Sequence, residues 1–310
     1  DIGKLPVIFC VDGQANREPP LGWHVLSIVD RNHLISDLMR TIQKQVDQGE
    51  LVSAVVEGGA GGDFIKIRTK LLLSVGPLKG DSYIRLSDIK YLKLFKQGDR
   101  FEIADMEKYT VRKGVEFLYL KRVDVQEFID KYNQDLERLG RKAIPFTLEE
   151  MAHVNNSIYE TVRELGSTIG FTKDVEVMSR HHMRMTVKAM GKNPKLGDIL
   201  GKLKLFEGEY ISSHSTLTSY LACAIASQLE WASEGTYQKL TMAAFMHDIL
   251  LSNIALAECE SLVEVKHKNF SEAEQKEFAG HPQKAAEQAR KFHEIPPDVD
   301  VIIAQHHERP

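Results

Sequence analysis

The hydrophobic periodicity of the chain changes near residue 145, and this change limits the folds open to it. Before that point, short β-branched runs bounded by Gly, Pro or Asp predict strands at 7–12, 23–30, 51–59, 64–75, 82–87 and 116–122. Helical spacing predicts helices at 35–46 and 123–139, and every strong segment after Pro145 is helical. The sequence therefore predicts an α+β protein, with a mixed α/β domain over 1–145 and an all-helical domain over 146–310.

Local signals mark the boundary and the helix starts. The basic segment from Gly140 to Pro145 contains helix-stopping Gly and Pro residues and is predicted to be the linker. Thr147-x-x-Glu150 and Ser271-x-x-Glu274 have the pattern of capping boxes, and Pro296-Pro297-Asp298 is a third start signal. Charge divides at the same place: residues 1–145 carry a formal charge of +2, and residues 146–310 carry −6.

Composition excludes several classes of protein. With 27% charged and 43% hydrophobic residues the chain is typical of a soluble globular protein, and a net charge of −4 gives no basic field for a nucleic-acid polymer. Three scattered cysteines (Cys10, Cys223 and Cys259) favour a reducing, cytoplasmic compartment over a disulfide framework. Residues 210–229 lack charge, but six of the first ten are Ser or Thr, which favours a buried helix over a membrane span.

Histidine is unevenly distributed. Seven of the 12 histidines fall in the last 97 residues, where an even spread would place about four. Apolar residues at helical spacing accompany three of them: Leu217, Leu221, Ile225 and Leu229 follow His214; Leu240, Ala243 and Ala244 precede His247; Val299, Ile302 and Ile303 precede His306. Pro282 is expected to start a new helix and to leave His281 at its entrance. The pattern places several imidazoles near buried helix faces.

Asp248 directly follows His247 and adds a carboxylate to this set. A buried carboxylate must be paired, protonated or bound to metal. Imidazole and carboxylate ligands suit divalent ions such as iron, zinc, manganese or nickel, and adjacent His247 and Asp248 can serve two ions if the carboxylate bridges them. The alternative is a set of independent core histidines; their placement on several helices favours a metal site.

Four blocks carry a family resemblance: His214-Ser215, His247-Asp248-Ile249, Gly280-His281-Pro282, and Ile302 through His306-His307-Glu308-Arg309. Their leading histidines are 33, 34 and 25 residues apart. In this order and spacing, residues 200–310 resemble the HD-GYP branch of the HD phosphohydrolases. The resemblance implies an HD-type helical bundle with a centre of two or three metals, often iron, that hydrolyses the bacterial messenger cyclic di-GMP.

The resemblance also implies individual roles. It assigns metal ligation to His214, His247, Asp248, His281, His306 and His307. It further assigns a catalytic role to Asp248 and substrate binding to Arg309. Members of the family with three metals carry a Glu four residues before the first histidine; that position is Tyr210 here, so two divalent ions are expected. Iron is the first expectation, with manganese, zinc or nickel as alternatives, and the ions would offset charge on the phosphoryl oxygens during hydrolysis.

The sequence departs from the family at Leu251. This leucine replaces the lysine of the HD-x-G-K motif, which the family implies to contact the scissile phosphate and to protonate the leaving oxygen. General-acid help of this kind is worth ~10²–10⁴ in rate. Lys266 and Lys268 could reach the pocket from the following loop, although a solvated turn is favoured. The histidines with charged neighbours are predicted at the surface: His181, His182, His267 and His293.

These observations lead to three hypotheses. The first is a cytoplasmic bacterial signalling protein whose helical domain is a binuclear phosphodiesterase for cyclic di-GMP or a related cyclic dinucleotide. The second keeps the metals without catalysis, as a degenerate cyclic-dinucleotide sensor or protein-docking module; the third is an HD hydrolase for another phosphoester. Residues 83–102 and 113–124 resemble a module that precedes HD-GYP domains, which implies a sensory or partner-binding role. Apolar residues at helical spacing form a stripe over 147–166. This stripe is expected either to form a homodimer interface or to pack in the core of the domain.

Overall fold

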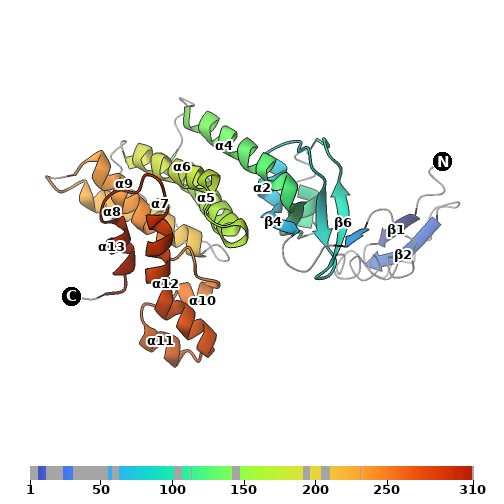
Figure 1. Cartoon of the computed structure of the whole chain (residues 1–310). Helices are drawn as coiled ribbons and strands as arrows, with labels where there is room; N and C mark the ends of the chain where they lie inside the picture. Colours follow the sequence, from blue (N-terminus) through green and yellow to red (C-terminus); the bar gives the residue numbers. More distant parts are fainter. Residues whose placement is uncertain are drawn as a thin grey trace. The chain divides into compact units, whose positions relative to one another are not determined.

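The computed structural model describes residues 6–11, 24–30, 55–57, 63–100, 107–112, 114–141, 147–190, 196–203, 210–230 and 232–308. The chain divides into two compact units, residues 1–128 and 129–310 (Figure 1). The division falls inside helix α4 (Val125–Arg141), which precedes most of the predicted linker. Residues 142–145 of that linker lie outside the described residues, so the domain boundary at 145 stays a prediction.

An antiparallel sheet of five strands, in the order β3-β6-β5-β7-β4, dominates the described part of the first unit. Its strands are β3 (Val55–Glu57), β4 (Phe64–Arg68), β5 (Ser82–Arg85), β6 (Lys90–Phe95) and β7 (Phe117–Lys121). The register pairs Ile65 with Leu120 and Ile67 with Leu118, and all four side chains are buried. One face of the β4–β7 pair is therefore apolar, as the period of two in a strand requires. A separate parallel pair is formed by β1 (Pro6–Val11) and β2 (His24–Asp30).

The observed elements of this unit differ in part from the predicted ones. The strand predicted over 64–75 is wrong in its second half, because Thr69–Ser74 forms helix α2. A continuous apolar run such as Leu71–Leu73 fits a buried helix as well as a strand, and periodicity alone does not separate the two. Strand β6 had no separate strand prediction, and short helical turns follow as η3 (Glu107–Arg112) and η4 (Arg122–Asp124). The helix predicted at 35–46 lies outside the described residues.

The described part of the second unit is helical. Beyond α4 its helices are α5 (Leu148–Ile169), α6 (Lys173–Met190), α7 (Leu196–Lys202), α8 (Tyr210–Ala226), α9 (Glu234–Met246), α10 (Ile254–Ala257), α11 (Leu262–His267), α12 (Glu272–Arg290) and α13 (Val299–Ala304). Both predicted capping boxes are present: Thr147 with Glu150 begins α5, and Ser271 with Glu274 begins α12. A sheet in the first unit and a helical second unit confirm the α+β class.

Helix α5 lies at the centre of the second unit and contacts α6 and α8. Its predicted apolar stripe is buried within the chain at Met151, Ile158, Val162 and Leu165. The stripe therefore contributes to the core of this unit, by the burial of apolar surface that stabilises helix packing. A homodimer through these helices stays a prediction.

Helix α8 covers most of the charge-free segment 210–229. Among the described residues no helix is long and apolar enough to cross a membrane. The apolar stripe predicted beside His214 is wrong at its far end, because Ile225 and Leu229 are exposed. The buried face instead carries small residues such as Ser215 and Ser219. Such residues allow close helix approach, and the Ser219 hydroxyl donates to the Ser215 carbonyl at 2.9 Å.

The predicted surface position of His181 and His182 is wrong, since both are buried on α6. The His182 side chain is fully buried, and its Nδ1 lies 3.3 Å from the carbonyl oxygen of Asn155 on α5. The charged neighbours that suggested exposure do not decide the orientation of an adjacent side chain on a helix, because successive residues point about 100° apart. Burial lowers the pKa of His182 to about 4.

This low pKa predicts acid sensitivity. Between about pH 6.5 and pH 4 the unfolded chain binds a proton at His182 and the folded chain does not, so the free energy of unfolding falls as the pH falls. The full difference corresponds to about 3 kcal/mol. In denaturant titrations of the metal-free protein, His182→Gln is expected to reduce the slope against pH, whereas exposed His267→Gln is expected to leave it unchanged. Equal slopes in wild type and His182→Gln would contradict the prediction.

Candidate metal centre

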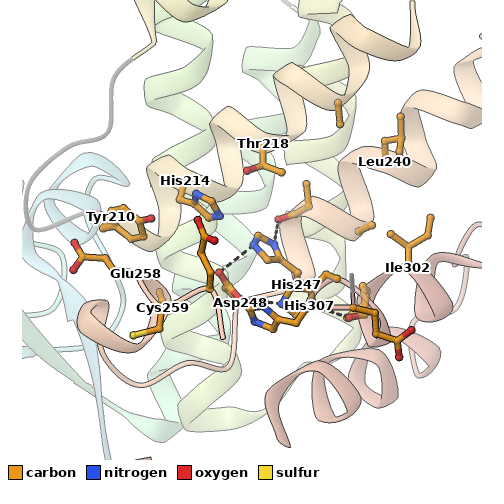
Figure 2. Close-up of a pocket in the computed structure, with 18 residues that line it drawn as sticks. Tyr210, His214, Thr218, Leu240, His247, Asp248, Glu258, Cys259, Ile302 and His307 are labelled. Atoms are coloured by element: carbon orange, nitrogen blue, oxygen red, sulfur yellow. Dashed lines mark hydrogen bonds and ion pairs between the residues drawn. The ribbon is translucent and has the colours of Figure 1, made fainter. Parts of the chain in front are cut away.

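A cavity of about 520 Å³ lies between α8, α9 and the end of α13 (Figure 2). Helix α8 lines it with residues at four-residue steps, namely Tyr210, His214, Thr218 and Ala222. This spacing puts all four side chains on one helix face. Helix α9 contributes the face that leads to His247, and α13 contributes Ile302 and Ile303. The last residue of α10, Ala257, and the loop residues 258–260 that follow it also line the cavity.

All six residues predicted as metal ligands come together in the second unit. They form two groups whose potential ligand atoms lie within 4.8 Å of one another. The first group is Asp248, His281, His306 and His307; the second group is His214, His247 and Asp248. Asp248 belongs to both groups, which is the arrangement that a bridging carboxylate requires.

The imidazole Nε2 atoms converge on the Asp248 carboxylate. Oδ2 lies 3.0 Å from Nε2 of His247, and Oδ1 lies 3.3 Å from Nε2 of His281 and 3.6 Å from Nε2 of His306. The Asp248 carboxylate is buried, so these imidazoles, rather than water, are its polar neighbours. His214 completes the second group beside His247, with ring centroids 5.4 Å apart, and its other face stacks on Tyr210.

Helix ends fix the orientation of two of these rings. His247 follows the last residue of α9, and its Nδ1 lies 2.8 Å from the carbonyl oxygen of Ala244. His306 follows α13, and its Nδ1 lies 2.7 Å from the carbonyl oxygen of Ile303. The last carbonyls of a helix lack partners within the helix and accept such hydrogen bonds. With the proton on Nδ1, each ring directs the lone pair of Nε2 toward the centre.

His281 reaches the same state by a different route. It lies inside α12 rather than at a helix entrance, and Pro282 continues the helix, so the predicted helix start is wrong. Proline has no N–H, so it leaves the carbonyl of Phe278, four residues earlier, without its helical donor. Nδ1 of His281 takes this place at 2.6 Å from the Phe278 oxygen. The proline thus frees an acceptor that orients a candidate ligand.

This arrangement makes Pro282→Ala informative. Alanine restores the helical N–H, which should stabilise α12 by about 1–3 kcal/mol. The same N–H competes with His281 for the Phe278 carbonyl, so the affinity for divalent metal should fall, by about 10-fold if this contact behaves as outer-shell contacts do. Thermal unfolding and metal titration measure the two opposite effects, with exposed Lys284→Ala on the same helix as the control. A stabilised variant with unchanged metal affinity would exclude this role for the proline.

The electrostatics of the cluster favour an ionised Asp248 carboxylate. Burial alone would lower the pKa of His247, but the charge of Asp248 and the hydrogen bond to it raise that pKa. Burial alone would raise the pKa of Asp248, but its contacts with His247, His281 and His306 hold that pKa well below the usual range. Burial, together with the neighbouring His306 and His281, lowers the pKa of His307 to about 4. Burial and nearby His247 also lower the pKa of His214. Neutral imidazole is the form that binds metal.

Two features of the structure test whether these residues fit a cation. Nε2 of His281 lies 3.1 Å from Nε2 of His306. When each ring is neutral with its proton on Nδ1, the two Nε2 lone pairs face each other, and a cation between them would make this contact favourable. Nε2 of His307 is also buried without a hydrogen-bond partner. The residues therefore fit a divalent metal site.

Other sequence predictions have different outcomes. Leu251 is 1% exposed and is not among the described residues that line the cavity; its carbonyl accepts a hydrogen bond of 2.6 Å from Arg163 on α5. Lys266 lies on α11 and Lys268 directly follows it, so the predicted loop is a helix at Lys266. Both lysines are exposed as expected, Lys268 pairs with Glu264 at 2.9 Å, and neither lines the described cavity. His267 is exposed as predicted. Arg309 lies outside the described residues, so its role stays a prediction.

Part of the cavity wall carried no sequence signal. Glu258 and Cys259 line one end beside Tyr210, in a short loop without helical or motif spacing (Figure 2), and Glu260 of the same loop also lines the cavity. Leu240 and Ile302 lie at the opposite, apolar end. Thr218 and Ala222 could have been found from His214 by adding four and eight residues, whereas the loop residues depend on the tertiary fold.

Comparison with known proteins agrees with this geometry. Residues 211–310 match the family described as HD domain, which agrees with the resemblance to the HD phosphohydrolases over that range. No curated protein matches the chain. One solved structure is similar, "Bd1817, a HDG"Y"P protein from Bdellovibrio bacteriovorus", with 18% identity and a TM-score of 0.48 over 79% of this chain and 77% of that one. The match to the HD domain and the two His/Asp groups together support a metal-dependent HD-type phosphohydrolase.

Proposed function

We propose that the HD domain belongs to the HD-GYP branch and is a binuclear phosphodiesterase for cyclic di-GMP or a related cyclic dinucleotide. One observation carries the proposal: two groups of ligands share Asp248 at the bottom of a cavity large enough for a nucleotide-sized ligand. Iron is the metal proposed first. Within this proposal the chain is a cytoplasmic bacterial signalling protein, and its N-terminal domain senses a signal or binds a partner.

Charge in the cavity assigns different tasks to metal and protein. The described lining residues include no Lys or Arg, but they include Asp248, Glu258, Glu260 and Glu308. These four carboxylates would repel a phosphate diester, and two divalent ions would offset their formal charge of −4. When bound, the ions supply Lewis-acid stabilisation of the phosphoryl oxygens and activate water for attack.

The protein itself then orients the ligand and the ligating groups. Asp248 and the Nε2 lone pairs hold the cations, and the Nδ1 contacts prevent the rings from turning. The Tyr210 and Thr218 hydroxyls are available in the wall as donors to phosphate or sugar oxygens. The apolar end at Leu240 and Ile302 can contact a base or sugar face and exclude water there.

The proposal is tested with protein purified anaerobically with excess iron. We expect two metal equivalents per chain, hydrolysis of cyclic di-GMP or cyclic di-AMP, and loss of both binding and hydrolysis after chelation. A panel of nucleoside monophosphates distinguishes the alternative HD hydrolase for another phosphoester. Less than one metal equivalent under these conditions would refute the proposal.

A degenerate sensor or docking module is the second candidate function, and Leu251 favours it. The position of the family's lysine holds a buried leucine that does not line the described cavity. Metal-dependent binding of cyclic di-GMP without turnover would support this candidate. Hydrolysis that depends on Asp248 would exclude it.

A further inference from the structure

The second unit contains a buried carboxylate that is not part of the metal centre. Glu176 lies in the first turn of α6, and its side chain is 4% exposed. Its Oε1 accepts hydrogen bonds from Arg180 Nη1 at 2.5 Å and from the His293 backbone N–H at 3.0 Å. Its Oε2 lies 3.2 Å from Nδ1 of His293. A carboxylate that is so little exposed to solvent needs these donors to offset the cost of burying its charge. The contact between Glu176 and His293 is therefore expected to persist in the folded protein.

His293 lies in the connection between α12 and α13, residues 291–298. This connection joins the helix that carries His281 to the helix that leads to His306 and His307. The sequence predicts a surface residue at 293, and the His293 side chain is 68% exposed, but its Nδ1 edge and backbone N–H face Glu176. Glu176 therefore holds the segment that sets where α13 begins.

Other contacts fasten the same connection. The ring of Phe292 packs against Phe171, just before α6, with centroids 6.2 Å apart. Nζ of Lys239 on α9 lies 3.1 Å from Asp298, the residue that precedes α13. Each of these two contacts constrains the connection less than the hydrogen bonds of Glu176 do. The pair of aromatic rings is less directional than a hydrogen bond, and the Asp298 side chain is 72% exposed to solvent.

The two groups of metal ligands depend on this connection to different degrees. The first group takes His281 from α12 and His306 and His307 from the end of α13. In the second group His214 comes from α8, and His247 and Asp248 follow α9. A change at 291–298 would therefore shift α13, and with it His306 and His307 of the first group, while leaving the ligands of the second group in place.

We propose that Glu176 is a positioning residue for the ion of the first group, acting through His293 and the 291–298 connection. The inference rests on the proposed binuclear centre. Metal sites tolerate deviations of only about 0.2 Å in ligand distance. Loss of a hydrogen bond that orients ligands typically costs 10–100-fold in metal affinity. Glu176 lies outside the cavity wall and supplies no ligand atom, so its effect is on affinity for one ion.

The test is a metal titration of the full chain after chelation, under anaerobic conditions, with Mn²⁺ as the probe. Wild type is expected to give two binding steps. His306→Ala identifies the step that belongs to the first group, and His214→Ala identifies the other. Glu176→Ala is expected to weaken the step that His306→Ala weakens, by about 10–100-fold, and to change the other by less than about 2-fold.

Three further variants protect the test from a folding artefact. Glu176→Gln keeps one oxygen for the His293 N–H and is expected to lose less affinity in the same step. His293→Ala removes only the Nδ1 contact from a mostly exposed side chain and is expected to weaken that step without preventing folding. Glu137→Gln breaks an exposed ion pair with Arg141 on α4 and serves as the unaffected control.

The outcomes separate this inference from the proposed function. If wild type shows two steps and Glu176→Ala and His293→Ala weaken both equally, or neither, Glu176 is not a positioning residue for one ion. If wild type binds fewer than two ions, the binuclear centre itself is wrong and the inference falls with it. Selective weakening of one step is the result that a general loss of stability would not produce.

Discussion

Asp248→Asn is expected to remove both metal ions and to lower phosphodiesterase turnover by about 10³-fold or more. Its carboxylate is the member common to both ligand groups, and the remaining candidate ligands are imidazoles, which carry no negative charge. Asparagine has nearly the same size but no charge, so two divalent ions would share a site without a negative ligand at its centre. Loss of the ions removes several kcal/mol of charge stabilisation in the transition state, and each 1.4 kcal/mol is a factor of ten in rate.

Metal content per chain and hydrolysis of cyclic di-GMP measure this effect. Asp198→Asn on α7 is the matched control, because Asp198 is an exposed carboxylate that does not line the cavity. The control should retain two ions and wild-type turnover. An Asp248→Asn protein that keeps both ions would exclude the bridging role, and one that keeps turnover would exclude hydrolysis at this centre.

The candidate centre could be located from the sequence because its chemistry needs particular residue types at particular helix positions. His247 and His306 follow helices whose buried apolar residues, such as Ala243, Ala244, Val299 and Ile303, indicate which side faces the interior, and the Asp beside His247 marks a buried charge. For His214 the order and spacing of the histidine blocks gave the signal, because the buried face of α8 carries small polar residues. The two capping boxes likewise act over four residues and are local signals. Such signals are retained in the tertiary structure because the hydrogen bonds that they require form among the same few neighbouring residues.

Features that depend on distant contacts were not predicted. Glu176 and His293 are 117 residues apart, and neither has a pattern that indicates the other. Pro282 predicts a helix start by local preference, but tertiary packing carries α12 through it and uses the freed carbonyl of Phe278. His182 is buried despite charged neighbours because its side of α6 faces α5 and Phe245, with a ring distance of 4.6 Å to that phenylalanine. In each case the packing of several helices decides the outcome.

Packing also decides what residue 251, the position of the family's lysine, can contact. Leu251 occupies the motif position, but its side chain is buried away from the described cavity wall, and Arg163 and Glu277 fix the adjacent backbone. A lysine placed there would put its ammonium group in an apolar site, near the guanidinium of Arg163. Burial of lysine shifts its pKa by 3 units or more, which corresponds to about 4 kcal/mol at neutral pH.

Leu251→Lys is therefore expected to lower the free energy of unfolding by about 4 kcal/mol and to leave turnover no higher than in wild type. Denaturant unfolding and steady-state hydrolysis of cyclic di-GMP measure the two parts. Leu251→Met is the control, because it keeps an apolar side chain of similar volume and should cost less than about 1.5 kcal/mol. If Leu251→Lys folds as stably as wild type and turns over ~10²-fold faster, the lysine reaches the phosphate from this position. That outcome would show that the leucine alone limits turnover. In the expected outcome, a lysine at 251 does not reach the phosphate unless the loop between Asp248 and α10 is also repacked.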